Sequence, residues 1–210
     1  MLGSGARAAV GRFWAPVAVR LARAGVTPDM VTVTGTVGAI AAAVTLIAHG
    51  VLFWGAFTVT LFVLLDMLDG ALARARGGGS AFGAVLDSTC DRAVDAAVFG
   101  ALVWWYTGAG DDRLLALLAL VGLTLGVLTS YIKARAEGVG IPCDVGLVER
   151  TERLILVLTG TGFTGLGIPY AVDVGLWLLV VGGVVTVGQR VVAVHRGARG
   201  RALTPTAPAP

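Results

Sequence analysis

The stretch that decides the fold is MVTVTGTVGAIAAAVTLIAHGVLFWGAFTVTLFVLL, residues 30–65, because it contains no Asp, Glu, Lys or Arg. A continuous helix of these 36 residues would be about 54 Å long, whereas the apolar core of a bilayer is about 30 Å thick. The stretch is therefore too long for one crossing. We expect two membrane-spanning helices that reverse direction around His49 and Gly50.

The composition of the whole chain agrees with a membrane environment. Of its 210 residues, 56% are hydrophobic and only 14% are Asp, Glu, Lys or Arg, against about 25% charged residues in soluble domains. So few charges cannot cover the surface of a soluble globule. Seven prolines among mostly apolar residues also argue against a disordered or fibrous chain. The expected fold is an all-α integral membrane protein.

Further apolar stretches raise the expected number of transmembrane helices to six. Each of them is close to the length that a bilayer requires, and a turn around Gly167, Pro169 and Asp173 is expected to separate the last two. Residues 27–196 are thus predicted to form one six-span domain. The four additional spans are residues 83–107, 114–132, 154–172 and 174–189.

Positively charged residues collect at one set of helix ends. In membrane proteins, Lys and Arg are enriched in the loops that face the cytoplasm. Of the 16 Lys and Arg residues, only Arg113 falls at the opposite ends of the predicted helices. We therefore expect a multi-pass protein of the cell membrane with both termini in the cytoplasm.

Two terminal segments are predicted to lie outside the six-span domain. In residues 1–26, arginines alternate with apolar residues such as Phe13 and Trp14, which predicts an amphipathic juxtamembrane helix on the cytoplasmic leaflet. Residues 197–210 end in a Pro, Ala and Thr tract and are expected to form a disordered cytoplasmic tail. Because Cys90 and Cys143 both map to the reducing cytoplasmic side, no disulfide is expected.

Four aspartates occupy the facing ends of the second and third predicted helices: Asp66, Asp69, Asp87 and Asp91. The members of each pair are three or four residues apart, so they lie near one face of their helix. A short glycine-rich turn joins these antiparallel helices, which lets the two pairs converge. Converging carboxylates repel one another unless protons or divalent cations neutralise them. Oxygen ligands without His or Cys favour Mg²⁺ or Mn²⁺, and two such ions would suit an in-line displacement at phosphorus.

Two other interpretations of the aspartates stay open. They could pair with nearby arginines in a structural network at the membrane surface, or they could serve a divalent-cation transporter. Transport predicts charges near the middle of the membrane and interrupted helices in paired halves, whereas these aspartates lie at helix ends. Because ionisable residues in membrane segments usually have a function, we favour a catalytic metal site that faces the cytoplasm.

The aspartates belong to a longer pattern. Residues 66–91 match every fixed position of D-x2-D-G-x2-A-R-x8-G-x3-D-x3-D, the CDP-alcohol phosphotransferase signature. The chain thus resembles that family, which implies transfer of a phosphatidyl or similar group from a CDP-linked donor to an alcohol, with release of CMP. The resemblance implies that Asp66, Asp69, Asp87 and Asp91 hold two Mg²⁺ or Mn²⁺ ions. It also implies that Asp91 is the catalytic base that accepts the proton of the attacking hydroxyl.

The resemblance further implies which residues bind the donor, CDP-diacylglycerol. Within the signature these are Gly70, Arg74 and Gly83. Glycines there would let the nucleotide approach the helix backbone, although small residues also favour helix packing. The beginning of the first span would offer free backbone N–H groups to the donor, or it would serve as a helix cap alone. The expected donor contacts outside the signature are Asp29, Met30, Val31, Thr32 and Ser80.

Cations at the cytoplasmic ends of the last three predicted helices indicate where the acceptor binds. Lys133 with the neighbouring Arg135, Arg153 and Arg190 would suit the phosphate of a phosphorylated alcohol, although the cytoplasmic excess of cations and salt bridges to nearby glutamates would also place them there. The surrounding segments, SYIKARAEG (130–138) and ERTERL (149–154), resemble the actinobacterial phosphatidylinositol phosphate synthase branch of the family. That resemblance implies myo-inositol phosphate as acceptor, with its phosphate held by Lys133, Arg153 and Arg190. It also implies phosphatidylinositol phosphate as product and a homodimeric protein.

A rival within the family is phosphatidylglycerophosphate synthase, which uses glycerol 3-phosphate. Its acceptor is also anionic, so a cationic pocket does not separate the two activities. The expected partners are CDP-diacylglycerol, myo-inositol phosphate, the lipid bilayer and a second copy of the chain, and no nucleic acid is expected.

One further acidic residue, Asp95, lies one helical turn beyond Asp91 and outside the signature. Its carboxylate would either tune the site or pair with Arg92, so the sequence leaves its role unassigned.

Overall fold

In a computed structural model of the protein, residues 20, 23–75 and 78–202 are described. Across these ranges the regular structure is entirely helical, with six long helices and one short 3₁₀ helix, so the predicted all-α fold is confirmed. Most of the predicted N-terminal helix and residues 203–210 lie outside the described residues. The helices are α2 (Pro28–Thr45), η1 (Ile47–His49), α3 (Leu52–Ala75), α4 (Ala81–Thr107), α5 (Arg113–Gly138), α6 (Arg150–Gly165) and α7 (Ala171–Ala202).

The stretch without charged residues, 30–65, forms most of two helices, and the chain reverses direction between them where predicted. After α2, the short helix η1 is followed by its cap Gly50, which has a φ of +80°. Glycine adopts this left-handed conformation without the steric cost of a Cβ atom. A side chain there would also clash with the indole ring of Trp105, which packs directly over Gly50.

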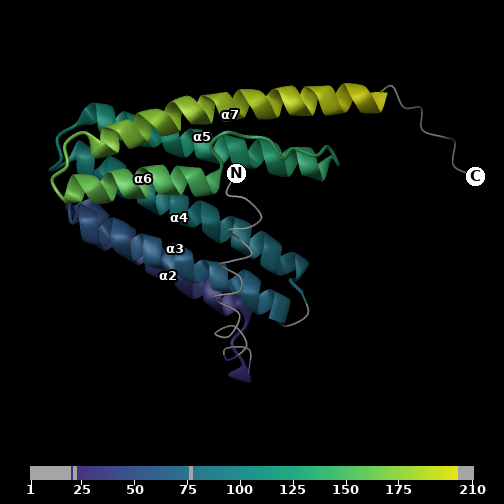
Figure 1. Ribbon diagram of the computed structural model, residues 1–210, viewed down its shortest axis with the longest axis horizontal. Coiled ribbons are helices and arrows are strands. Elements are labelled where there is room, and N and C mark those ends of the chain that lie inside the picture. The colour runs from purple at the N-terminus through teal and green to yellow at the C-terminus, as the bar shows by residue number, and fades with distance from the viewer. Residues whose placement is uncertain (1–19, 21–22, 76–77, 203–210) are drawn as a thin grey trace, which may run out of the picture.

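Successive helices run in alternating directions, so their connections fall at two ends of the bundle (Figure 1). In this view the α2–α3, α4–α5 and α6–α7 connections lie at the left, and the α3–α4 and α5–α6 connections lie towards the right. Helix α2 packs against α3 and α4, α5 packs against α4 and α7, and α6 packs against α7 and α3. The aspartates near the α3–α4 connection and the cations near the α5–α6 connection therefore occupy the same end.

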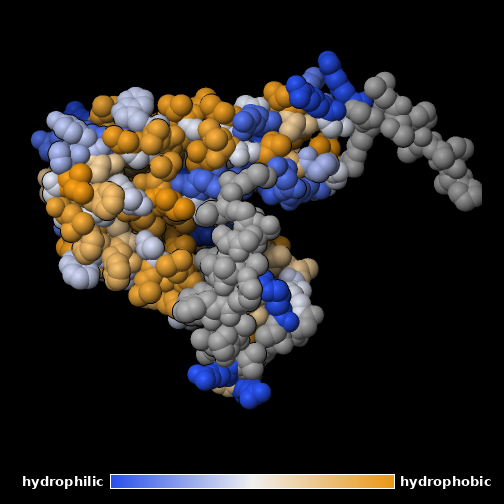
Figure 2. Space-filling view, in the orientation of Figure 1, coloured by the Kyte–Doolittle hydropathy of each residue, from blue (hydrophilic) through white to orange (hydrophobic). Residues whose placement is uncertain are grey.

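Four of the long helices are both long and apolar enough to cross a membrane: Pro28–His49, Leu52–Arg74, Arg113–Gly138 and Ala171–Arg199. Helix α4 differs because its N-terminal half carries several charged residues, and α6 differs because it has only 16 residues. Hydrophobic residues cover much of the face seen in Figure 2. Such a surface suits contact with lipid rather than with water.

The last two helices differ from the prediction at both of their ends. The α6–α7 connection covers residues 166–170, so Val172, predicted in the fifth span, lies in the first turn of α7. Asp173 lies in the first turn of α7 as well, and not in the connection. The helix dipole favours a negative charge in that first turn. Helix α7 continues to Ala202, so residues 197–202, which we expected in the tail, extend the helix. Arg199 in this segment suits the negative end of the helix dipole.

Small residues allow the helices to approach closely around the core. A Cβ atom on Gly175 of α7 would lie 2.7 Å from the carbonyl oxygen of Leu156 in α6. One on Gly165 would clash with the backbone of Phe53 in α3. Helix α6 is therefore held against the backbones of two neighbours, in the manner of helices packed in membranes.

Candidate active site

Three aspartates converge at the end of the bundle that carries the α3–α4 connection. Carboxylate oxygens of Asp66, Asp69 and Asp87 lie within 4.8 Å of one another, and all three residues are partly buried. Asp66 and Asp69 come from the C-terminal half of α3, and Asp87 comes from the second turn of α4. The antiparallel pairing of these helices thus brings together carboxylates from both halves of the signature, as predicted.

This acidic cluster, Asp66, Asp69 and Asp87, fits a divalent cation. Three carboxylates at such a separation repel one another unless a positive charge lies between them. One oxygen of Asp66, Oδ1, is buried without a hydrogen-bond partner, which is costly unless another ligand satisfies it. All the available donors are oxygen atoms, the ligands that Mg²⁺ and Mn²⁺ prefer.

Two hydrogen bonds fix the orientation of the Asp69 carboxylate. The hydroxyl of Thr32 donates to Asp69 Oδ2 at 2.7 Å, and the backbone N–H of Gly70 donates to Asp69 Oδ1. Thr32 is buried in the first turns of α2. We expected Thr32 and Gly70 to contact the donor, and the structure shows that they also orient a candidate metal ligand, as outer-shell partners commonly do.

Asp91, the fourth aspartate of the signature, lies between two arginines. Its Oδ1 is 2.8 Å from Nη1 of Arg150 on α6, and its Oδ2 is 3.7 Å from Nη2 of Arg92. The acidic cluster does not include Asp91. The structure therefore brings together three of the four predicted metal ligands, and the fourth, Asp91, is paired with two guanidinium groups.

The N-termini of α2 and α4 lie side by side next to the acidic cluster. Ser80 caps α4, since its Oγ accepts the backbone N–H of Gly83 at 2.8 Å. A Cβ atom on Gly83 would lie 3.2 Å from Asp29 Oδ1. Thr27 caps α2 in the same way and accepts the backbone N–H of Met30 at 3.2 Å. The predicted donor residues Asp29, Ser80 and Gly83 are thus neighbours, and the capping role is also present.

The other predicted donor residues are spread over the same surface. The side chain of Met30 is exposed, whereas Val31 packs against the buried pair Ala71 and Leu72 of α3. The guanidinium of Arg74 lies near Gly70, because a Cβ atom on Gly70 would be 3.6 Å from Arg74 Nη1. Val31 therefore serves the contact between α2 and α3, and Arg74 reaches back over the signature glycine.

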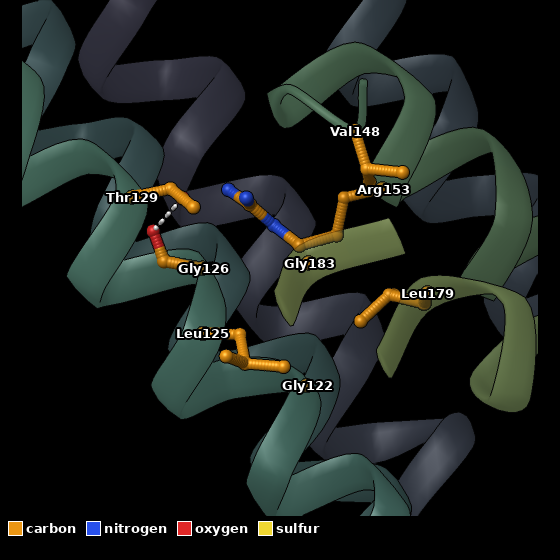
Figure 3. Close-up of a pocket in the computed structure, with 8 residues that line it drawn as sticks. All are labelled: Gly122, Leu125, Gly126, Thr129, Val148, Arg153, Leu179 and Gly183. Carbon is orange, nitrogen blue, oxygen red and sulfur yellow. Dashed lines mark hydrogen bonds between the residues drawn. The ribbon is translucent and has the colours of Figure 1, made fainter. Parts of the chain in front are cut away.

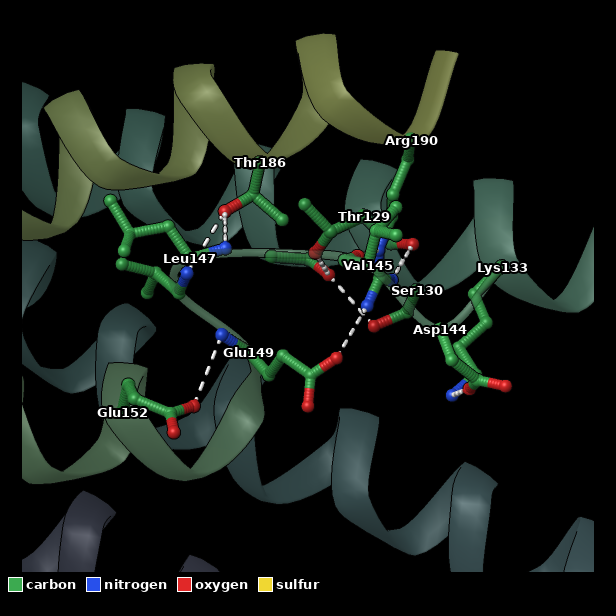
Figure 4. A network of polar contacts seen from close by, with 12 residues as sticks. Thr129, Ser130, Lys133, Asp144, Val145, Leu147, Glu149, Glu152, Thr186 and Arg190 are labelled. Carbon is green, nitrogen blue, oxygen red and sulfur yellow. Dashed lines mark hydrogen bonds and ion pairs between the residues drawn. The ribbon is translucent and has the colours of Figure 1, made fainter. Parts of the chain in front are cut away.

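Arg190 of α7 forms hydrogen bonds and an ion pair with the α5–α6 connection (Figure 4). Its side chain is almost fully buried, and its guanidinium donates to the carbonyl oxygens of Val145, at 2.9 Å from Nε, and of Thr129. A third contact joins Nη2 to Glu149 Oε1 at 3.2 Å. One turn earlier, Thr186 accepts two backbone N–H bonds from the same connection. The salt-bridge alternative considered for this cation is therefore realised.

Lys133 is also paired with acidic side chains. Its Nζ lies 2.6 Å from Asp144 Oδ1 and 3.8 Å from Glu137 Oε1. The hydrogen bond and the positive charge of Lys133 lower the pKa of the exposed Asp144 carboxyl. Ion pairs in such exposed positions contribute little to stability, so a phosphate could replace Asp144 at small cost.

Arg153 is buried where α4, α5 and α6 meet. It is 3% exposed, and its Nη2 is 2.5 Å from Asp95 Oδ2 on α4. Figure 3 shows its side chain reaching from α6 towards Gly126 and Thr129 on α5, and these residues line one narrow pocket. Because Arg190 also donates to Thr129, two of the three predicted acceptor cations meet at the same turn of α5.

The sequence did not reveal that Arg150 contacts the proposed catalytic base. Arg150 and Arg153 are three residues apart at the beginning of α6, so they lie near one face of that helix. This spacing could have indicated that both guanidinium groups face α4, where Asp91 and Asp95 lie one turn apart. Glu149, the partner of Arg190, was considered only as one of several glutamates that might neutralise a cation.

The fold and the site define the class of protein. A model of the CDP-alcohol phosphatidyltransferase family matches residues 25–195, a range that contains the acidic cluster, the helix N-termini and all three cations. The chain belongs to this family, so the resemblance inferred from the signature is confirmed.

Individual relatives agree with the branch that was predicted. The phosphatidylinositol phosphate synthase of Mycobacteroides abscessus is 50% identical over 181 residues, which cover 86% of this chain and 82% of that protein. The crystal structure of Mycobacterium tuberculosis phosphatidylinositol phosphate synthase with CDP-DAG bound matches with a TM-score of 0.87 and 49% identity, over 93% of this chain and 99% of the other. Its complex with manganese and citrate matches with a TM-score of 0.86, also at 49% identity, over 92% and 93% of the two chains.

Proposed function

We propose that this chain transfers the phosphatidyl group of CDP-diacylglycerol to a hydroxyl of a myo-inositol phosphate, forming phosphatidylinositol phosphate and CMP. The observation that carries this proposal is that Arg150 joins the two parts of the site, since it contacts Asp91 beside the acidic cluster and lies one turn from the buried Arg153. Carboxylates suit a metal-bound pyrophosphate, and arginines suit the phosphate of an acceptor. The names of the relatives indicate the same donor and product.

The signature aspartates would hold the metal. We assign two Mg²⁺ or Mn²⁺ ions to Asp66, Asp69, Asp87 and Asp91, and the manganese complex of the relative supports an ion of this kind. Bound metal would stabilise the negative charge of the pyrophosphate as a Lewis acid. Because Asp91 is paired with Arg150, metal binding and ion pairing compete for the same carboxylate.

The neighbouring N-termini of α2 and α4 would bind the donor. The first turn of a helix has backbone N–H groups without helical partners and a partial positive charge, and both attract phosphate. The donor contacts would also couple to the metal, because Thr32 and Gly70 orient Asp69. The proposed donor residues are Asp29, Met30, Val31, Thr32, Gly70, Arg74, Ser80 and Gly83.

The chain's own residues would then act on the acceptor. Lys133, Arg153 and Arg190 would hold its phosphate, which fixes the position of the attacking hydroxyl. Asp91 accepts the proton of that hydroxyl as the oxygen bonds to the β-phosphorus. The bond from the β-phosphorus to the bridging oxygen breaks, and CMP leaves with that oxygen.

We further propose that all six long helices cross the cell membrane, with the site and both termini in the cytoplasm, and that the protein is a homodimer. The uneven distribution of Lys and Arg supports the orientation. The charges of α4 are compatible with a crossing, because Asp87 and Asp91 lie in its N-terminal half, towards one surface. Asp95 lies near the middle of the helix, and residues 96–107 after it carry no charged side chain.

The activity is tested with purified protein in detergent, Mg²⁺ and CDP-diacylglycerol, by measuring CMP release with separate acceptors. We expect release with myo-inositol phosphate and little with glycerol 3-phosphate or with myo-inositol. Preference for glycerol 3-phosphate would favour a phosphatidylglycerophosphate synthase. If no alcohol caused CMP release, the enzymatic role would be contradicted. That result would favour the alternative in which the aspartates serve cation transport.

A further inference from the structure

Asp95 lies at the centre of a charged cluster between the metal site and the acceptor cations. It is 3% exposed, and its Oδ2 lies 2.5 Å from Arg153 Nη2 and 3.6 Å from Arg92 Nε. Its Oδ1 lies 3.8 Å from Arg150 Nε. One buried carboxylate thus faces three guanidinium groups, two of which also contact Asp91.

Stability alone is a weak explanation for this cluster. Removing charges from water is costly, and apolar residues of similar size often stabilise a fold as well as a buried ion pair does. Several polar atoms of the cluster are also buried without a hydrogen-bond partner, among them Asp95 Oδ1 and Arg153 Nε. Three arginines against Asp91 and Asp95 leave an excess of one positive charge. The cluster therefore suits an anion.

A second observation shows that the Arg153 guanidinium is held from two sides. Opposite Asp95, it lies against Gly126 of α5, where a Cβ atom would be only 3.0 Å from both Cζ and Nε of Arg153. This is closer than a normal van der Waals contact, so any residue larger than glycine would push the guanidinium away. The ion pair with Asp95 on α4 and the backbone of α5 at Gly126 together fix the position of the Arg153 guanidinium.

We propose that Asp95 is the positioning residue of the acceptor site. It holds the Arg153 guanidinium between α4 and the Thr129 turn of α5, and it places Arg150 between itself and the base Asp91. Asp95 acts through these arginines and does not contact the substrate. This inference rests on the proposed function, because it takes Arg153 as a ligand of the acceptor phosphate.

The principal test is Asp95→Asn, which keeps the size of the side chain and removes its charge. For this variant and the wild type we would measure kcat, the KM values of myo-inositol phosphate and CDP-diacylglycerol, the Kd of myo-inositol phosphate by calorimetry, and the melting temperature. We expect the KM and the Kd of myo-inositol phosphate to rise about tenfold or more, because a buried guanidinium has lost its partner. The KM of CDP-diacylglycerol should stay within about twofold of the wild-type value.

Two further variants separate positioning from folding. Gly126→Ala retains every charge but displaces the guanidinium, so it should also raise the KM of myo-inositol phosphate. Gly100→Ala, on the same helix as Asp95, adds a methyl group where nothing lies within 4 Å and should leave both KM values unchanged. Asp95→Glu, which restores the charge, should recover part of the lost affinity.

The inference would be overturned if Asp95→Asn lowered the melting temperature and kcat while the affinity for myo-inositol phosphate stayed as in the wild type. Should Asp95→Asn fail to fold, normal acceptor affinity in Gly126→Ala would overturn it instead. Failure of the proposed function would look different, because the wild-type protein itself would neither bind myo-inositol phosphate nor release CMP with it. That result would contradict both proposals.

Discussion

Asp91 shows why the position of a single side chain matters in this protein. The signature places it with the metal ligands, whereas the structure places it between Arg92 and Arg150. Because both partners of the Arg150–Asp91 pair are partly exposed, the pair adds little stability. Its importance lies in occupying a carboxylate that metal binding and proton transfer would both require.

Replacing the base should stop the chemistry without preventing donor binding. We predict that Asp91→Asn lowers the rate of CMP release about 100- to 10,000-fold, the usual contribution of a general base. Binding of CDP-diacylglycerol should persist, since its proposed contacts lie on α2, α3 and the beginning of α4. The measurements are single-turnover CMP release and donor binding. Asp112→Asn, a cap at the opposite end of the bundle, is the matched control, and wild-type rates in Asp91→Asn would disprove the assignment.

Removing the competing arginine should strengthen metal binding. We predict that Arg150→Ala lowers the Kd of Mn²⁺ about two- to fivefold, as expected when an ion pair worth up to about 1 kcal/mol no longer opposes the metal. Titration of Mn²⁺ followed by electron paramagnetic resonance would measure this change. Arg113→Ala, at the other end of the bundle, should have no effect. Weaker Mn²⁺ binding in Arg150→Ala would show that the arginine supports the metal site instead.

Among the helices, α6 is the element that links the acidic residues of α4 to the proposed acceptor cations. It contributes Arg150 and Arg153, and its position is set by close backbone contacts with α3 and α7. The length of apolar stretches predicted the existence of the helices, and Gly50 predicted the first reversal. Gly167 and Pro169 lie in the α6–α7 turn as predicted, but the ends of the two helices were misplaced. The residues on both sides of the turn are apolar, so hydropathy alone could not locate these boundaries. Gly167 and Tyr170, both with positive φ, mark the turn in the structure.

A methyl group between α6 and α7 should destabilise the bundle. We predict that Gly175→Ala lowers the free energy of unfolding by about 1–3 kcal/mol, the usual cost of overpacking, because its Cβ atom would meet the backbone of α6. Gly188→Ala on the same helix should be neutral or stabilising, because nothing lies within 4 Å of its added Cβ and alanine favours helices. Thermal unfolding of both variants in detergent would compare them. Equal melting temperatures would contradict the proposed close packing.

In the whole molecule, helices far apart in the sequence bring the charged residues to one end. The signature located the aspartates because their spacing is local to α3 and α4. The partners of the arginines could not be located in that way, since Asp95 and Arg153 are 58 residues apart and Thr129 and Arg190 are 61 apart. Only the packing of α4, α5, α6 and α7 shows that these groups meet.

The proposed activity is tested most directly by the identity of the lipid that forms when two acceptors compete. Purified protein would receive CDP-diacylglycerol, Mg²⁺ and equal concentrations of myo-inositol phosphate and glycerol 3-phosphate, and mass spectrometry would identify the lipids formed. We predict phosphatidylinositol phosphate in large excess, in an amount equal to the CMP released, and neither product with Asp91→Asn. Phosphatidylglycerophosphate as the main product, or no phosphatidyl transfer to either alcohol, would contradict the proposed activity.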